Sequence, residues 1–140
     1  MSGKNQSKNE CITLQLKRNQ VGRNQVWLNG KELDPDVSRK VRDHSPGGFE
    51  WGYLGSGPAQ LALSICLELW PDVATRLYQD FKKMYIAPLK KSDIVEVNLN
   101  VGDFERIVWN AREEKKAQDE LWGEIEKEKN NKDMTDELPF

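Results

Sequence analysis

A glycine-dense segment at residues 44–65 holds the residues whose types and spacing best suit ligand chemistry. It contains five of the ten glycines of the chain and three aromatic residues, and it runs directly into an apolar stretch typical of a helix. Where a glycine loop enters a helix, backbone N–H groups point outward and the helix dipole favours an anion. Gly55, Ser56 and Gly57 occupy this position, which predicts a site for a phosphate or carboxylate group. The alternative is that the glycines only let a tight loop pack against the helix.

The three aromatic residues of this segment alternate along the chain as Phe49, Trp51 and Tyr53. In an extended conformation they share one face, where they could stack on a nucleobase. The alternative is that at least two of them fill the core beneath the loop, and we expect a mixture in which one aromatic side chain is exposed. The carboxylate of Glu50 would bind either a base edge or ribose hydroxyl, or the backbone of the loop.

Two side chains at the start of the loop carry further chemistry. His44 is the one histidine of the chain and the natural general acid–base candidate, but no serine or cysteine nucleophile stands in a recognisable motif, so we favour a hydrogen bond that anchors the loop. Arg42 follows Arg39 and Lys40 and could bind a phosphate, or these are ordinary edge charges that discourage aggregation. The glycine spacing matches neither established nucleotide-binding pattern. We therefore assign no catalytic residue, metal or cofactor.

Composition and charge exclude several classes of protein. The net charge of −2 gives no basic field that would recruit nucleic acid or an anionic membrane. No apolar run approaches the roughly 20 residues that span a bilayer. Residues 1–10 are polar, lack the apolar core of a signal peptide and are expected to be disordered. Cys11 and Cys66 are too few for a disulfide framework, so we expect reduced, core-facing thiols in a cytoplasmic protein.

Apolar periodicity predicts a single α+β domain at residues 11–112, in which a small antiparallel sheet packs on a helical hairpin. Strands are expected at 12–17, 25–28, 31–33 and 94–101, with a type I′ turn at Asn29-Gly30. A helix at 58–69, capped by Ser56 or Gly57, is apolar on nearly every side and therefore central. The second helix of the hairpin is expected to begin at Pro71 or Asp72 and to bury Val73, Leu77, Phe81 and either Met84 or Tyr85.

A long helix is predicted after Gly102-Asp103, with an apolar stripe over its first turns. Residues 113–140 then form a charged helix and, from residue 130, a mobile tail. Leu121, Trp122 and Ile125 are the apolar residues of this charged helix, which is either solvated or binds a partner. Exposure of Trp122 or of the loop aromatics would favour a homo-oligomer.

The segment His44-Ser-Pro-Gly-Gly-Phe-Glu-Trp-Gly-Tyr-Leu-Gly-Ser-Gly-Pro-Ala-Gln-Leu-Ala-Leu63 resembles the signature of an uncharacterised domain family of bacteria and their phages. That signature reads H-x-P-x-G-F-x-W-G-Y-G-G-S-G-P-A-Q-L-A-L. The resemblance covers roughly residues 20–110, and Leu54 stands where the family often has glycine. The family has no known function, so the resemblance implies a fold outline and a phage or prophage setting.

These observations lead to three functional hypotheses. The first is a non-enzymatic phage accessory or counter-defence protein that sequesters a nucleotide immune signal, or another phosphate-bearing ligand, at the glycine loop. The alternative is a protein–protein inhibitor or adaptor that acts on a bacterial defence enzyme through its C-terminal helix. The third, an enzyme, would need His44 with Glu50 or Asp43 as an acid–base pair, and it ranks below the others. The step from a phage setting to counter-defence is an analogy.

Overall fold

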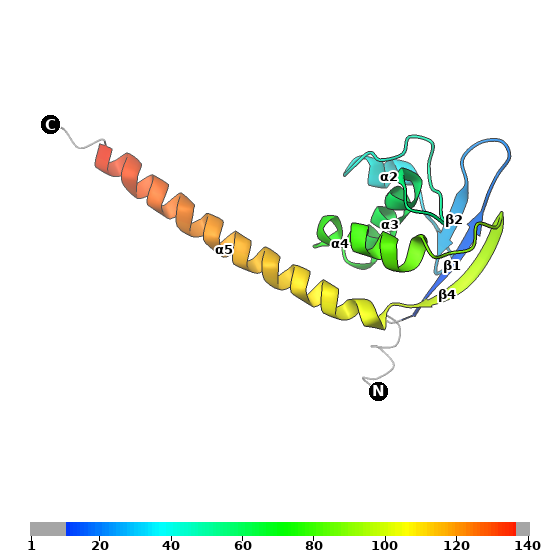
Figure 1. Ribbon diagram of the computed structural model, residues 1–140. Helices are drawn as coiled ribbons and strands as arrows, with labels where there is room; N and C mark the ends of the chain where they lie inside the picture. The colour runs from blue at the N-terminus through cyan, green and yellow to red at the C-terminus, as the bar shows by residue number, and fades with distance from the viewer. Residues whose placement is uncertain (1–10, 137–140) are drawn as a thin grey trace.

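The computed structural model describes residues 11–136, with side chains described as far as residue 129 (Figure 1). A four-stranded antiparallel sheet forms one layer, in the order β3-β2-β1-β4. Its strands are β1 (Cys11–Lys17), β2 (Gln25–Leu28), β3 (Lys31–Glu32) and β4 (Ile94–Asn100). Helices α2, α3 and α4 cover one face of the sheet, and α5 leaves this body as a long rod (Figure 1). The predicted α+β class is confirmed.

The sheet has one apolar face because apolar residues alternate along its strands. Ile12, Leu14 and Leu16 of β1 are buried, and in register beside them lie the half-buried Leu99, Val97 and Val95 of β4. Both residues of the Asn29-Gly30 turn have positive φ, as the predicted type I′ turn requires. Cys11 begins β1 on the opposite, exposed face, so the prediction that its thiol faces the core is wrong, whereas Cys66 is buried.

The centre of the body is α3 (Ser56–Leu69), in which every residue from Gly57 to Cys66 is buried. It begins two residues before the predicted start, and the backbone of Gly55, rather than Ser56 or Gly57, caps it. Ala59 N–H donates to the Gly55 carbonyl and closes the first turn, so Pro58, with no N–H to donate, lies in that turn without loss of a bond.

The hairpin continues with α4 (Ala74–Phe81), which begins later than Pro71 or Asp72 because residues 71–73 form a turn. A π-helical turn, η1 (Lys82–Ile86), follows directly. The wider π turn places Tyr85 half-buried against Phe81 and leaves Met84 exposed, which settles the predicted alternative between these two residues.

A short helix, α2 (Pro35–Arg39), was missed by the sequence prediction, which treated Asp34-Pro35 only as a turn signal. The Asp34 carboxylate accepts from Asp36 N–H at 2.9 Å and caps the helix, and Pro35 takes its first position. This helix positions the chain that enters the glycine loop.

After a 3-10 turn, η2 (Gly102–Phe104), the helix α5 (Glu105–Asp136) runs for 32 residues, about 48 Å. Phe104, Val108 and Ala111 pack on the core, and the remainder projects past the body (Figure 1). The helix continues to Asp136, so residues 130–136, where a mobile tail is predicted, are helical; residues 137–140 and the predicted disorder of 1–10 lie outside the described residues. Between residues 11 and 136, no helix combines the length and apolarity that a membrane span requires.

Candidate functional site

The aromatic row of the glycine loop is divided between core and surface. Phe49 and Trp51 are 1% and 0% exposed, whereas Tyr53 is 42% exposed. The predicted mixture with one exposed aromatic residue therefore matches the structure. The prediction that Phe49 and Trp51 bind a ligand by stacking on a nucleobase is wrong, because a fully buried ring offers no face to a base.

Arg18, to which the sequence analysis gave no role, binds Glu50 and packs on Trp51. Arg18 Nε and Nη2 donate to Glu50 Oε1 at 3.0 and 2.8 Å, and its guanidinium carbon lies 4.4 Å from the centre of the Trp51 ring. Arg18 Nη1 also donates to the carbonyls of Lys91 and Ser92. The carboxylate of Glu50 thus closes the loop instead of facing a ligand. No local signal could have shown this, because Arg18 and Glu50 are 32 residues apart.

Three glycines of the loop allow close packing. A Cβ on Gly57 would lie 2.6 Å from Glu50 Cβ, and one on Gly52, whose φ is +86°, would lie 2.7 Å from Lys91 Cγ. A Cβ on Gly55 would meet the ring of Tyr53 at 2.5 Å. Each glycine therefore has a structural role, in agreement with the alternative that the glycines let a tight loop pack against the helix.

Gln60 holds the entrance of the loop from inside α3, although the sequence reading gave it no role. Its buried Oε1 accepts from the N–H groups of His44 and Ser45 at 2.8 and 3.0 Å. Its Nε2 donates to Ser38 Oγ at 2.8 Å and to the Arg42 carbonyl at 3.1 Å. His44 Nε2 is also 2.7 Å from the hydroxyl of Tyr78. The prediction that His44 anchors the loop is confirmed.

Two basic residues near the loop, Arg23 and Arg39, are used in ion pairs. Asp36 lies 2.9 Å from Arg23 and 2.8 Å from Arg39, and Arg39 also pairs with Asp43 at 3.0 Å. Hydrogen bonds from Arg23 and Arg39 lower the pKa of Asp36 to about 2. The Arg42 side chain is exposed. Of the cations predicted to attract a phosphate, Arg39 is thus neutralised by carboxylates, whereas Arg42 and Lys40 have no ion pair among the described residues.

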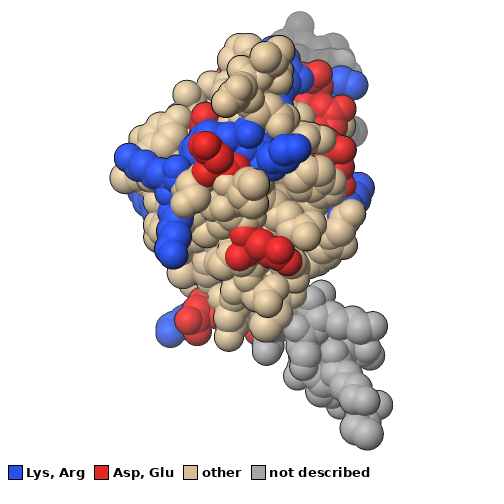
Figure 2. Space-filling model, turned by 90° about the vertical axis from the view of Figure 1, so that its right-hand side faces the viewer, with Lys and Arg blue, Asp and Glu red and all other residues tan. Residues whose placement is uncertain are grey.

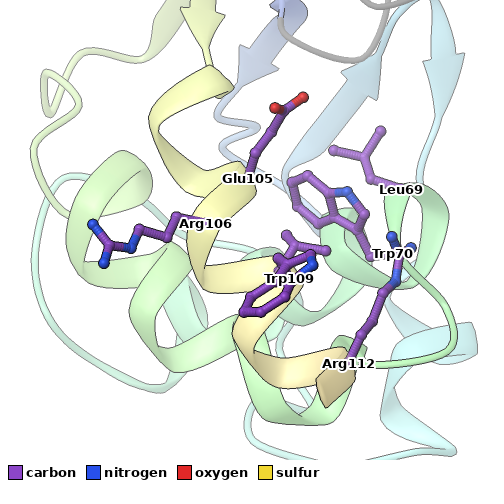
Figure 3. A pocket seen from close by; sticks show the side chains of 7 residues that line it. Leu69, Trp70, Glu105, Arg106, Trp109 and Arg112 are labelled. Atoms are coloured by element: carbon purple, nitrogen blue, oxygen red, sulfur yellow. The ribbon is translucent and has the colours of Figure 1, made fainter. Parts of the chain in front are cut away.

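A hollow of about 520 Å³ lies between the end of α3 and the start of α5 (Figure 3). Its lining residues are Leu69, Trp70, Glu105, Arg106, Val108, Trp109 and Arg112. Trp109 is 62% exposed, and the Arg106 side chain extends away from the two tryptophans (Figure 3). Arg112 Nε donates to Asp72 Oδ2 at 2.8 Å, which lowers the pKa of Asp72. The sequence reading missed Trp109, whose signal was a tryptophan beside the apolar stripe.

Leu121, Trp122 and Ile125, which we call the α5 patch, lie one turn beyond Gln118, the last described residue of α5 that forms a hydrogen bond with the body. That hydrogen bond joins Gln118 to Arg76 of α4. All three patch residues are exposed, Trp122 at 57%. Trp122 follows Trp109 by thirteen positions, which at about 100° per residue places these two tryptophans about 140° apart around the helix. The hollow and the α5 patch are therefore separate surfaces.

Fold and site together define a small α+β domain with a closed glycine loop and a projecting helix. The chain belongs to the family of unknown function DUF6166, whose model matches residues 15–110. The predicted resemblance to an uncharacterised domain family is confirmed at this level, while its bacterial and phage setting stays a prediction. The match ends before the α5 patch. No curated protein and no solved structure matches the chain.

The family supplies no activity, and nothing in the comparisons indicates one. Across the described part of the chain, no group of three or more His, Cys, Asp or Glu side chains is arranged to hold a metal ion.

Proposed function

We propose that this chain is a protein-binding module, an inhibitor or adaptor, that engages its partner through the α5 patch. The observation that carries the proposal is the exposure of Leu121, Trp122 and Ile125 on a helix that extends beyond the body (Figure 1). Leu121 and Ile125 are four residues apart, and Trp122 and Ile125 three, so all three share one helical face. A helix of this kind fits the apolar groove of a partner.

The residues around the α5 patch define the chemistry of that groove. Residues 113–129, which include the patch, contain seven acidic and four basic side chains, so this half of α5 is acidic as a whole. The partner is therefore expected to have an apolar groove with a basic rim. Trp122 is the residue expected to dominate the binding energy, since tryptophan is enriched at such hot spots.

The partner class to test first is a bacterial defence enzyme. This choice is supported by the resemblance of residues 44–63 to a family of bacteria and phages. It goes beyond the family match, which carries no function. In this proposal the chain acts in the cytoplasm of a bacterium as a counter-defence protein that needs no chemistry of its own.

The test compares two tryptophans of the same helix. Trp122→Ala removes the centre of the α5 patch, and Trp109→Ala removes a tryptophan of similar exposure from another side of α5. Partners are isolated from bacterial lysate on the wild-type chain, and the dissociation constant of each purified candidate is then measured by calorimetry. Trp122→Ala should weaken binding about 30-fold or more, the effect of a residue worth at least about 2 kcal/mol, while Trp109→Ala should change it less than threefold. Equal effects of both variants would contradict the proposal.

We also propose a second candidate, the sequestration of a nucleotide at the glycine loop, which one observation favours. Tyr53 and Leu54 are both exposed at the tip of the loop, beside Ser56 in the first position of α3. A base could stack on Tyr53 while a phosphate meets the N-terminus of α3.

Thermal shift measurements with cyclic dinucleotides and cyclic ADP-ribose variants test this second candidate. A ligand with a Kd near 1 nM should stabilise the fold by about 4 kcal/mol at micromolar concentration. Tyr53→Ala should abolish that shift. Without a shift for any nucleotide, the second candidate fails and the α5 proposal is unaffected.

A further inference from the structure

The two edges of the sheet differ in how well they are protected. β3 is an edge of two residues, whereas β4 is an edge of seven residues that, among residues 11–136, pairs with β1 alone. All seven residues of β4 pair in continuous register, so the strand has no bulge. It has no proline or lysine, and its one charged residue is Glu96. Bulges, prolines, lysines and other charged residues are the usual features that prevent edge-to-edge pairing, and of these β4 has only Glu96.

The hydrogen-bonding groups on the outer side of β4 can be assigned from the register. Arg18 N–H donates to the Asp93 carbonyl at 2.7 Å, and the residue pairs of an antiparallel ladder alternate. Val95, Val97 and Leu99 therefore direct their backbone groups to β1. The N–H and C=O groups of the four intervening positions point away from the sheet, and these are Ile94, Glu96, Asn98 and Asn100.

The apolar face of β4 is also incompletely covered. Val95, Val97 and Leu99 pack against the core but stay half-exposed at the rim of the sheet. On the other face, Ile94 is 75% exposed. Figure 2 views the molecule from the side where β4 lies in Figure 1, and uncharged residues cover much of that side. A second strand at this edge would bury apolar surface as well as form hydrogen bonds.

We propose that the β4 edges of two copies of this chain pair in antiparallel orientation about a two-fold axis at Val97, which joins the two sheets into one of eight strands. In this register Glu96 of one copy faces Asn98 of the other, and Ile94 faces Asn100. These are the four outward-directed positions, so the alternation of the ladder fits. Val95 meets Leu99 and Val97 meets Val97, which covers the half-exposed apolar row.

Charge selects this register over its neighbour. A twofold axis at Glu96 would place two carboxylates directly opposite one another, and like charges in that position are unfavourable. An axis at Val97 opposes each carboxylate with an amide and keeps all seven residues paired. An axis at Asn98 would pair only five. A second copy is thus a better occupant of this edge than an unrelated peptide, since the sequence of β4 is complementary to itself.

The test uses sedimentation equilibrium of the full chain over a range of concentrations. We expect a dimer of about twice the 16.2 kDa chain mass. Asn98→Glu should raise the dimer dissociation constant about tenfold, because each introduced carboxylate faces Glu96 of the other copy. Glu96→Lys alone should leave the dimer within about threefold of wild type. The double variant Glu96→Lys/Asn98→Glu should restore or strengthen the dimer, because opposite charges then face each other.

Three results would overturn the proposal. The first is a full chain that stays monomeric at all concentrations. A chain that dimerises only after residues 1–10 have been removed would count against the proposal in the same way. The second is a dimer that Asn98→Glu does not weaken or that the double variant does not restore. The third is a dimer that Trp122→Ala dissociates, which would place the contact on α5. Glu96 and Asn98 side chains lie on the exposed face, so circular dichroism is expected to show unchanged folding for every variant.

Discussion

The glycine loop and the outer half of α5 use aromatic residues in opposite ways. In the loop, Phe49 and Trp51 are buried, and an arginine, a glutamine and tight glycine contacts hold the surrounding chain. On α5, Trp122 is more than half exposed, one turn beyond the hydrogen bond that joins Gln118 to the body. The segment with the more suggestive motif is thus closed by its own chain. The segment without a recognisable motif presents exposed apolar side chains.

The most damaging change should come from the buried half of the loop. Trp51→Ala is expected to lower the free energy of unfolding by about 3–5 kcal/mol, because it leaves a cavity and removes the ring beneath Arg18. Tyr53→Ala, two residues away and exposed, should change it by less than about 1 kcal/mol. Urea denaturation of both variants measures the difference. Similar losses would show that the division of the aromatic row is not real.

Replacing the buried amide should cost somewhat less. Gln60→Leu keeps the volume but removes partners from His44, Ser45, Ser38 and Arg42. We expect a loss of about 2–4 kcal/mol, since buried N–H and C=O groups are left unsatisfied. Hydrogen exchange should show faster exchange of the His44 and Ser45 amides. A neutral effect on stability and exchange would argue that water replaces the amide.

The glycines provide a matched pair. Gly57→Ala places a methyl group 2.6 Å from Glu50 Cβ, which cannot move without shifting the loop, and is expected to cost about 1–3 kcal/mol. Gly55→Ala meets the exposed Tyr53 ring, which can rotate away, and should cost less than half as much. The ratio of the two losses in thermal unfolding is the measurement. A larger loss for Gly55→Ala would indicate that Tyr53 is held in place.

For α5 we expect almost no effect on stability. Trp122→Ala should change the free energy of unfolding by less than about 0.5 kcal/mol, because the side chain lies outside the core. The contrast with Trp51→Ala is the sharpest form of the comparison, since the same substitution removes the same ring in both regions. A loss above about 1 kcal/mol would mean that the patch packs on this chain itself.

The smallest expected effect is a decrease in the free energy of unfolding at low pH. Arg23 and Arg39 lower the pKa of Asp36 to about 2, and Arg112 lowers the pKa of Asp72. A carboxyl whose pKa is lowered by folding stabilises the fold above its ordinary value of 3.8, and this contribution is lost as pH falls toward 2. Stability should therefore decrease over that interval, and Asp36→Asn and Asp72→Asn should each flatten the decrease. Denaturation curves from pH 5 to pH 2 measure it, and a slope unchanged in both variants would contradict the assignment.

Much of the fold followed from local pattern. Alternation gave the strands around Leu14 and Val97, and two positive-φ residues closed the turn at Asn29-Gly30, as expected of that dipeptide. The central position of α3 also followed, because a helix that is apolar on all sides must be buried. Exact starts of α3 and α4 did not follow, since backbone capping at Gly55 and the turn at 71–73 leave weak marks in the sequence.

The candidate site was less predictable, because its decisive contacts join residues far apart in the chain. Arg18 reaches Glu50, and Gln60 reaches His44, across 32 and 16 residues. Nothing near Glu50 shows that its carboxylate is already bound. The residues of the α5 patch could be identified from the sequence, because apolar residues within a charged helix are recognised from their neighbours in that helix alone.

The sequence by itself determined the α+β class, the buried character of α3 and the apolar residues of the charged helix, because local periodicity encodes each of them. Tertiary structure alone decided that the glycine loop is closed, that Phe49 and Trp51 are core, and that β4 is a long edge. The physical reason is that burial and pairing depend on which distant segments meet. A residue type indicates what its side chain is able to bind, but only the folded structure shows whether that side chain is already bound within the protein.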